Sequence, residues 1–236
     1  MISVCLATYN GSAFVAEQLR SVLTQLGAND EVVVSDDASS DDTLSIISGL
    51  ADARIRVLQV SGKLGVVKNF ERALMAARGD IIFLCDQDDV WLPCKVERCL
   101  AALAGCQLVV TDCIVVDGDL NPQSPSFFQM RKSGAGLLKN LWKNSYLGCC
   151  MAMRSDLLKA ALPFPSNIAM HDWWIGLVAE MTGSVVFIDE QLSLYRRHGG
   201  NATPTGMRST APIIQQLIWR VEMVRNLLVH CFNFKR

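Results

Sequence analysis

The sequence predicts an α/β fold with a Rossmann-like, mostly parallel sheet flanked by helices and a helical extension at the C-terminus. Through residue 90, short apolar runs alternate with segments whose apolar residues recur at helical spacing. This alternation is typical of parallel strands joined by right-handed crossovers. The run at 81–85 is apolar at every position, as expected of a strand buried on both faces. Because 50% of the 236 residues are hydrophobic, the chain can bury a sizeable core.

The N-terminal half supplies four predicted strands, which we expect at 2–7, 31–34, 55–58 and 81–85. Apolar stripes predict helices at 14–26 and 70–77, and Gly27 supplies a stop for the first. An acidic, hydroxyl-rich loop from Ser35 to Thr43 leads into a further helix, which Ser40 or Asp41 would cap.

The chain changes character after Trp91. We expect helices at 95–103 and from about residue 170, and strands at 108–117, 144–153, 184–188 and 192–195. The segment 120–136 is rich in proline and glycine and predicts a long loop. A long loop inside a compact domain is usually functional or disordered.

Composition excludes several classes of protein. The net charge of -1 argues against nucleic-acid binding through bulk charge. The nine cysteines are scattered without CxxC spacing, which predicts buried free thiols in a reducing cytoplasm. The N-terminus lacks the basic and apolar regions of a signal peptide, and no apolar run approaches the ~20 residues of a spanning helix. We therefore expect a cytoplasmic protein.

Asp86, Asp88 and Asp89 follow the buried 81–85 run. Open α/β sheets bind their ligands at the carboxyl ends of the strands. Three carboxylates this close repel one another, and a divalent cation held between them and a diphosphate would remove the repulsion. The alternative is a solvated acidic turn that caps the next helix near Pro93. The buried strand before the acids favours the ligand site.

Four stretches together resemble the family 2 glycosyltransferases with a GT-A type fold: Leu6 to Gly11, Val34 to Thr43, Gly65 with Lys68-Asn69, and Asp86 to Asp89. The later stretches His171 to Trp174 and Tyr195 to Asn201 are similar to the branch that includes rhamnosyltransferases of bacterial surface polysaccharides. The resemblance implies one GT-A domain at 1–205, with a nucleotide-binding half at 1–91 and an acceptor-side half at 92–205. The loop at 120–136 would form part of the acceptor-side wall.

The resemblance also implies a nucleotide site. The Tyr9 ring would lie against a pyrimidine face, and Asp37, or less favourably Asp36, would accept from its N3–H. Lys68 stands where the family often carries arginine, so a bidentate contact would be lost. The implied nucleotide-binding residues are Thr8, Tyr9, Asn10, Asp36, Asp37, Lys68, Asn69, Asp86 and Gln87.

A metal and a leaving-group site are implied beside it. Asp86 and Asp88 match the family's DxD motif, with Asp88 and His198 as ligands of Mn²⁺ or Mg²⁺. Arg197 and His198 would stabilise the charge that develops on the leaving diphosphate. The alternative for this basic segment is a solvated turn.

Asp172 matches the family's catalytic acid residue. Inverting sugar transfer needs a base that takes the proton of the acceptor hydroxyl, and we assign that role to Asp172, with His171 as a packing neighbour. The alternative is a helix N-cap without chemistry.

The leading interpretation is an inverting, metal-dependent glycosyltransferase. Its donor would be dTDP-rhamnose or a UDP-sugar, and its acceptor a hydroxyl of a glycan or lipid-linked molecule in polysaccharide or O-antigen synthesis. One alternative is a non-catalytic module that binds a nucleotide sugar or a partner. Another is a nucleotidyltransferase, which is disfavoured because Thr8 to Ser12 contains no basic residue. The oligomeric state is left open.

Residues 206–236 are expected to contain an amphipathic helix that begins at Pro212. Trp219 and Phe232 would suit a lipid interface, which would make the protein peripheral on the inner face of the cell membrane. Packing of this helix on its own domain is the alternative.

Overall fold

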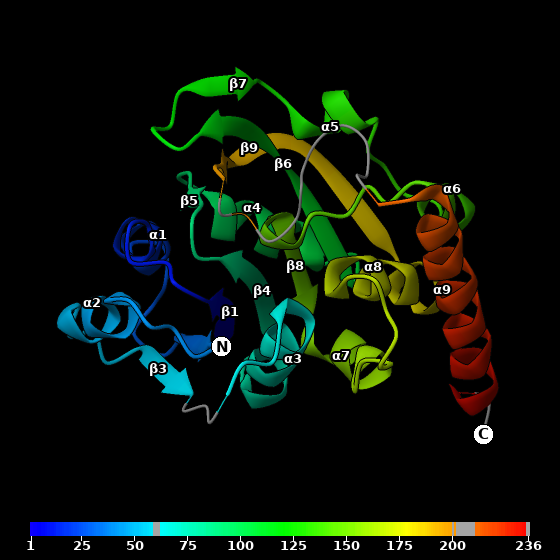
Figure 1. The fold of residues 1–236 in the computed structure, drawn as a ribbon, viewed down its shortest axis with the longest axis horizontal. Helices are drawn as coiled ribbons and strands as arrows, with labels where there is room; N and C mark the ends of the chain where they lie inside the picture. The colour runs from blue at the N-terminus through cyan, green and yellow to red at the C-terminus, as the bar shows by residue number, and fades with distance from the viewer. Residues whose placement is uncertain (59–61, 200, 202–210, 235–236) are drawn as a thin grey trace.

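The computed structural model describes residues 1–58, 62–199, 201 and 211–234, with side chains up to His230. Within these residues the strands form one nine-stranded sheet in the order β3-β2-β1-β4-β8-β6-β9-β5, with β7 paired to β6. Helices cover both faces of this sheet (Figure 1). The α/β class, with a mixed and mostly parallel sheet, is confirmed.

The predicted strands and helices of the N-terminal half form, although the first helix ends at Leu23 and not at Gly27. Parallel pairing joins β1 (Ile2–Thr8) to β2 (Glu31–Asp36) and β4 (Ile81–Asp86), and β2 to β3 (Ile55–Leu58). The crossovers are α1 (Val15–Leu23), α2 (Thr43–Gly49) and α3 (Val66–Ala76).

Both faces of these strands are buried, as the apolar runs predict. Val4 and Leu6 pack on one side of β1, in a cluster with Val15, Leu19 and other side chains, whereas Cys5 belongs to the cluster on the opposite side. Alternation along a strand sends neighbouring side chains to opposite faces, so an uninterrupted apolar run is needed to fill two cores.

Two helix starts differ from expectation. α3 begins at Val66 rather than at residue 70, because Gly65, at φ +82°, turns the chain into the helix before its apolar stripe begins. At α2, Asp41 rather than Ser40 supports the first turn, since its Oδ1 accepts the N–H of Thr43 at 3.1 Å.

The C-terminal half combines parallel and antiparallel pairs. Helix α4 (Lys95–Leu103) and strand β6 (Leu108–Asp117) form as predicted. Strand β8 (Met151–Arg154) lies between β4 and β6 and is antiparallel to both. The short strand β5 (Val90–Trp91) pairs antiparallel with β9 at the edge of the sheet. β8 therefore joins the two halves into one sheet.

The two short strands expected at 184–188 and 192–195 form one strand, β9 (Val185–Arg197). It runs parallel to β6, with register shifts between Thr111 and Asp112 and between Asp112 and Ile114. The charged pair Asp189-Glu190 made the sequence look interrupted, but both side chains are exposed within the strand. As a result, Arg196 and Arg197 lie in the strand and not in a turn after it.

The expected loop at 120–136 is partly regular. It contains β7 (Pro122–Ser124) and α5 (Phe127–Arg131), and α6 (Leu137–Trp142) follows. Ser126 caps α5, and Asp112 on β6 accepts both the Ser126 hydroxyl and the N–H of Phe128, the latter at 2.9 Å. These contacts are long-range, so local sequence could not predict them.

The expected strand at 144–153 is also wrong over most of its length. A single 3₁₀ turn (Gly148–Cys150) precedes β8, and α7 (Ser155–Ala161), which the sequence did not predict, follows it. The helix expected near residue 170 is α8 (His171–Thr182).

The predicted C-terminal helix is α9 (Ile213–Phe234), which packs along α6 and α8. Its inner face buries Met223 and Leu227, with Trp219 partly buried beside them. Residues 206–210, Lys235 and Arg236, which the sequence placed in this region, lie outside the described residues. None of the helices in the described segments has the length and apolar content needed to cross a membrane.

Gly79, between α3 and β4, gives a test of the sheet's N-terminal packing. A Cβ added there would lie 2.6 Å from the backbone N of Ser3 and 2.8 Å from the carbonyl carbon of Ile2. Gly79→Ala should therefore lower the free energy of unfolding by about 1–3 kcal/mol, the usual cost of overpacking. Urea unfolding followed by circular dichroism measures this change.

The matched control is Gly49→Ala, because no atom lies within 4 Å of a Cβ added at that position. If both variants unfold at the same urea concentration as the unmodified protein, the close approach of Gly79 to β1 is wrong.

Candidate active site

The carboxyl ends of β1, β2 and β4 lie side by side. Their register pairs Thr8 with Asp36 and Ala7 with Asp86. The polar side chains that follow these strands therefore meet at one edge of the sheet, as expected for an open α/β sheet.

Asp36 holds the loop after β2. Its buried carboxylate accepts the Thr8 hydroxyl at 2.8 Å and the N–H of Ser39 at 2.8 Å, and the Ser39 hydroxyl at 2.6 Å. These bonds engage both carboxylate oxygens inside the protein. Of the two neighbouring acids, Asp37 is thus the better candidate for contact with a ligand.

Asp37 connects this loop to the start of α3. Its carboxylate accepts the backbone N–H groups of Leu64 and Gly65, the latter at 3.0 Å, and its own N–H donates to the Thr8 carbonyl at 2.8 Å. A carboxylate can accept about four hydrogen bonds, so Asp37 keeps acceptor capacity beyond these two.

Gln87 fixes the end of β1 against the end of β4. Its Oε1 accepts the Tyr9 N–H at 2.9 Å and its Nε2 donates to the Tyr9 carbonyl at 3.0 Å. Gly11 is required beside this pair, because a Cβ there would lie 2.2 Å from Gln87 Oε1. The Gln87 amide is thus committed to the backbone of Tyr9.

The Tyr9 ring itself is 41% exposed at the sheet edge. The Lys63 ammonium lies 3.7 Å from the ring centroid, a cation–π contact over one face. Asn10, at φ +46°, accepts the N–H of Ser40 at 2.9 Å.

Lys68 and Asn69 point to different places. Lys68 pairs with Glu71 on the surface of α3, whereas Asn69 is 2% exposed and its Nδ2 donates to the Thr8 carbonyl at 3.3 Å. Arg72, one helical turn beyond Lys68, binds the Ser35 hydroxyl and the Asp36 carbonyl, each at 2.9 Å. Arg72 was not among the residues predicted for the site, although residues four apart share a helix face.

Asp88 and His198 meet across the site, as the resemblance implied. Asp88 Oδ2 lies 2.8 Å from His198 Nε2 and accepts from Asn201 Nδ2 at 2.9 Å. Their approach depends on β9, which carries the His198 side chain to the acidic turn after β4. The contact of Asn201 with Asp88 was not predicted from the sequence.

The neighbouring arginines differ in burial. Arg196 is 3% exposed; its Nε donates to the Asp88 carbonyl at 2.6 Å and its guanidinium pairs with Glu17 on α1. Arg197 is half-buried, and its Nε has no hydrogen-bond partner within the described residues. Arg196 therefore fastens the acidic turn, whereas Arg197 keeps a donor available.

The donor atoms fit a hard divalent cation. Carboxylate oxygen and imidazole nitrogen from Asp88 and His198 are ligands that Mn²⁺ takes readily. A second group brings Asp86, Asp89 and Cys149 ligand atoms within 4.8 Å of one another, and in the described part of the chain buried Asp89 Oδ2 has no hydrogen-bond partner. The thiol in that group suits softer metals, so the Asp88–His198 pair is the better match for Mn²⁺ or Mg²⁺.

Burial raises the pKa of Asp86 to about 8, and the charges of Asp88 and Asp172 contribute to the increase. Burial likewise raises the pKa of Asp89 well above its usual value. The Lys95 ammonium, which is fully buried, opposes the increase at Asp86. Its Nζ donates to the Cys149 carbonyl at 2.7 Å and to the Ser193 hydroxyl at 2.6 Å.

Asp172 lies in the first turn of α8. Burial raises the pKa of its carboxyl to about 6, and backbone N–H groups of Trp173 and Gly148 partly oppose the increase. The Trp173 N–H lies 2.6 Å from Asp172 Oδ1. A Cβ built at Gly148 would lie 3.7 Å from Asp172 Cβ and 3.9 Å from Leu84 Cδ1, so Asp172 lies beside β4, the strand that ends at Asp86.

His171 is a packing residue. Its ring stacks on Phe70 with centroids 4.0 Å apart, and burial lowers its pKa to about 3. It is therefore neutral at physiological pH, and among the described residues neither ring nitrogen has a hydrogen-bond partner.

A family model described as glycosyl transferase family 2 matches residues 3–162, more than half of the chain. The chain belongs to this family. The matched residues include both halves of the DxD motif and stop before Asp172 and His198.

Three curated relatives of the family 2 chain each match more than four fifths of it, at 25–28% identity. It is 28% identical over 224 residues to a dTDP-rhamnosyl transferase, RfbG, of Shigella flexneri, a match that covers 83% of this chain and 72% of the relative. It is 25% identical over 206 residues to WfgD of Escherichia coli, named as a UDP-Glc:alpha-D-GlcNAc-diphosphoundecaprenol beta-1,3-glucosyltransferase, covering 83% and 77%. A match to an uncharacterized glycosyltransferase of Nostoc, 25% identical, covers 85% of this chain but 66% of that protein.

Solved structures support the GT-A fold of the family 2 chain. TarS of S. aureus, in a complex with UDP-GlcNAc, superposes with a TM-score of 0.73 at 23% identity, over 98% of this chain and 66% of the other. Glucosyl-3-phosphoglycerate synthase of Mycobacterium tuberculosis, in a complex with Mn²⁺ and UDP, gives 0.61 at 22% identity, over 98% and 80%. At these identities the likeness establishes the fold, and the predicted GT-A class is confirmed.

Lys95 gives a test of how this family 2 site is held together. Lys95→Met should lower the free energy of unfolding by about 2–4 kcal/mol, because the buried Cys149 carbonyl and Ser193 hydroxyl lose a charged donor. Urea unfolding at neutral pH measures the change.

Lys159→Met, at an exposed lysine of α7, is the matched control and should leave stability nearly unchanged. Equal stabilities of the two variants would show that the Lys95 ammonium is not a buried donor.

Proposed function

We propose that the chain is an inverting glycosyltransferase that moves a sugar from dTDP-rhamnose or a UDP-sugar to a hydroxyl of a glycan or lipid-linked acceptor in polysaccharide or O-antigen synthesis. The names of the Shigella and Escherichia relatives support this substrate class. The observation that carries the proposal is the buried Asp172 carboxyl beside β4, the strand that ends at Asp86. A proton acceptor and the DxD acids then serve one reaction centre.

On the donor side, the Tyr9 ring would stack on the base and Asp37 would accept its imide N–H. Thr8, Asn10, Asn69 and Gln87 would act by holding the backbone of this pocket, since their polar groups bond neighbouring strands and loops. Asp36 would do the same. Lys68 would approach the phosphates only by leaving Glu71.

Asp86, Asp88 and His198 would face the diphosphate. When bound to Asp88 and His198, Mn²⁺ or Mg²⁺ would neutralise charge on the phosphate oxygens. Arg197, whose Nε has no hydrogen-bond partner among the residues that the structure describes, would add to this stabilisation of the leaving group.

The transfer itself would be a single displacement. The acceptor oxygen forms a bond to the anomeric carbon of the sugar as the bond from that carbon to the diphosphate oxygen breaks. The diphosphate leaves with the electron pair, and the proton of the acceptor hydroxyl passes to Asp172. Because attack comes from the face opposite the leaving group, the anomeric configuration inverts.

The metal assignment predicts that Asp88→Asn abolishes the Mn²⁺-dependent part of donor binding and leaves the fold intact. The amide keeps the shape of the carboxylate but is a poor ligand for a hard cation. Thermal-shift titration of UDP and dTDP with and without Mn²⁺ measures the effect, because a ligand of the native state raises stability by mass action.

Asp80→Asn is the matched control, since that side chain is 86% exposed at the start of β4. Mn²⁺-dependent binding that survives in Asp88→Asn would remove Asp88 from the metal site.

The base pocket predicts a difference between two Tyr9 variants. Tyr9→Ala should weaken binding of the free nucleoside diphosphate by about 1 kcal/mol, the usual worth of an aromatic stack. Tyr9→Phe keeps the ring and should bind like the unmodified protein. Isothermal titration calorimetry separates the two, and equal affinities in all three proteins would place the base elsewhere.

Asp172→Asn should lower turnover roughly 10²–10⁴-fold, the usual contribution of acid–base catalysis, with little change in donor affinity. The rate of the unmodified enzyme should fall as the pH drops below about 6, where the carboxyl of Asp172 takes up a proton. Turnover and nucleotide-sugar binding, measured across pH on both proteins, give the comparison.

The same substitution has a separate effect on stability. Because folding raises the pKa of Asp172 above its unfolded value, the native state favours the protonated form, and this contribution is lost as the pH rises through about 6. Asp172→Asn should therefore be more stable than the unmodified protein at pH 7.5, with the difference vanishing near pH 4.

If the rate of sugar transfer by Asp172→Asn is near that of the unmodified enzyme, Asp172 is only a helix cap and the proposed base is wrong.

A further inference from the structure

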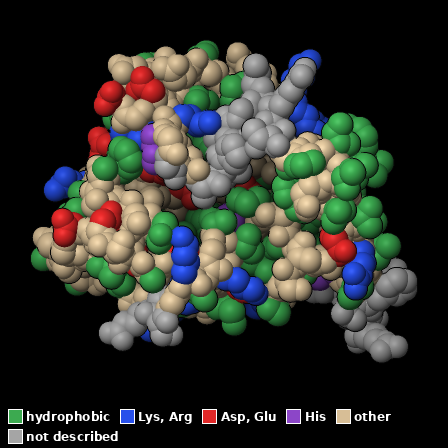
Figure 2. Space-filling model, in the orientation of Figure 1, with side chains coloured by type: hydrophobic (Ala, Val, Ile, Leu, Met, Phe, Trp, Pro, Cys, Tyr) green, Lys and Arg blue, Asp and Glu red, His purple; other side chains and the backbone are tan. Residues whose placement is uncertain are grey.

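The outer face of α9 is apolar and exposed. Ile213 is 76% exposed and Val221 is 65% exposed, although the opposite side of the same helix is buried against α8. Figure 2 shows hydrophobic side chains gathered at the right of the molecule, over α6 and α9. The main exposed apolar residues of the stripe are Ile213, Ile214, Leu217, Ile218, Val221 and Leu228.

Helix α6 extends this surface. Leu138 is 80% exposed and Trp142 is 72% exposed. Arg220 of α9 donates to the Trp142 carbonyl from Nε at 3.1 Å and from Nη2 at 2.8 Å, and its guanidinium lies 5.2 Å from the indole centroid. The two helices therefore present one surface, which we call the α6–α9 face.

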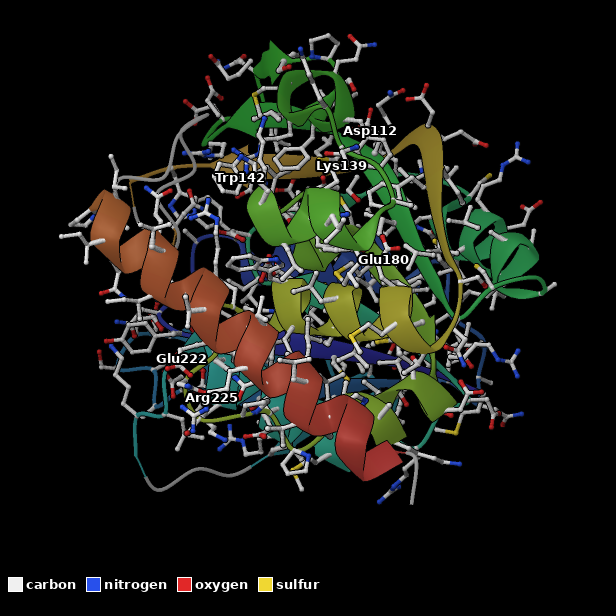
Figure 3. All side chains as sticks on the ribbon, turned by 90° about the vertical axis from the view of Figure 1, so that its right-hand side faces the viewer. Asp112, Lys139, Trp142, Glu180, Glu222 and Arg225 are labelled. Carbon is white, nitrogen blue, oxygen red and sulfur yellow. The ribbon has the colours of Figure 1, made fainter. Side chains whose placement is uncertain are left out.

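The charges of the α6–α9 face are mostly positive. Lys139 and Lys143 stand on or beside α6, and Arg220 and Arg225 on α9. In the sequences of these two helices Glu222 is the one acidic residue, and its carboxylate bonds Arg225 at 3.4 Å and also accepts from Asn167. Figure 3 views the molecule from this side, with α9 crossing the front and Lys139, Trp142, Glu222 and Arg225 around it.

We propose that the α6–α9 face docks on the surface of an anionic lipid bilayer, with α9 lying along the membrane plane. Its aliphatic side chains would enter the boundary between headgroups and acyl chains, as in interfacial helices. Trp142 would lie at headgroup level, and the lysines and arginines would reach the lipid phosphates. No helix of the described segments can span a bilayer, so attachment would be to the surface.

The position of Arg225 favours lipid over a second copy of this chain. Its side chain is 71% exposed and lies within the apolar stripe, one turn from both Val221 and Leu228. A dry helix pair would bury this guanidinium together with its Glu222 partner, and taking both charges out of water is costly. At a lipid surface the same group stays hydrated and has phosphates to contact.

The proposal does not depend on the proposed transfer reaction, since the α6–α9 face contains none of the residues assigned to the active site. Its test needs neither donor nor acceptor, so a failure of the proposed chemistry would leave the result unchanged.

The experiment is co-sedimentation of the full chain with vesicles of phosphatidylglycerol and phosphatidylcholine, compared with phosphatidylcholine alone. Binding should require the anionic lipid and weaken as salt rises. Ile214→Glu combined with Val221→Glu should reduce the partition coefficient by at least about tenfold, since two apolar side chains no longer enter the lipid. Lys139→Glu combined with Lys143→Glu should reduce it similarly on anionic vesicles.

Matched controls place the same changes elsewhere on the surface. Leu100→Glu alters an apolar side chain 39% exposed on α4, and Arg20→Glu reverses an exposed charge on α1. Both should bind vesicles like the unmodified chain, and urea unfolding should show that every variant is folded.

Two outcomes would overturn the proposal. One is a chain that does not sediment with anionic vesicles, or whose α6–α9 variants bind as well as the controls. The other is a dimer, detected by light scattering, that the Ile214→Glu and Val221→Glu pair dissociates while vesicle binding is absent; a second copy would then cover the face.

Discussion

The burial of acidic side chains in the turn after β4 is the constraint on which the rest of the site depends. Asp88 is 8% exposed and Asp89 is fully buried, and carboxylates so placed need partners or protons. The chain supplies partners from distant segments: His198 and Asn201 for Asp88, and the backbone N–H of Arg196 for Asp89 at 2.9 Å. Lys95 adds a buried positive charge. The acidic turn can form only when β9 and α4 have docked on the N-terminal sheet.

Many of the polar residues at the sheet edge form hydrogen bonds within the protein itself. The bonds of Gln87, Asp36 and Asn69 join strand ends and loops to one another. By fixing the backbone around Tyr9 and Asp37, they would reduce the entropy lost when a ligand binds. A family motif therefore marks a mixture of residues that would contact the ligand and residues that hold those contacts in place.

Local patterns in the sequence predicted the parts of the fold that local physics determines. The apolar runs gave β1 to β4 nearly residue by residue, and helical periodicity gave α4 and α8. Prediction failed where distant residues decide the structure: α5 depends on Asp112, and β8 is short because Gly148–Cys150 turns beneath His171 and Asp172. In the candidate site, the closeness of Asp88 and His198 followed from the family resemblance. The burial of Lys95 and Arg196 could not be predicted in this way, because lysine and arginine side chains are mostly exposed in proteins.

The register shifts between β6 and β9 decide which arginine is buried. Thr111 pairs with Ile188 and Asp117 with Arg197, so β9 has three more residues than β6 over this stretch. Side chains alternate along a strand, so an odd number of extra residues exchanges the two faces of β9 relative to β6. In an unshifted ladder Val116 would pair with Ser193 and Asp117 with Leu194, so Arg196 would lose its place beside Asp88 and Glu17. The extra residues of β9 between Ile188 and Leu194 therefore set which of its side chains face the acidic turn, and deleting one of them would exchange the two faces of the strand from there to Arg197.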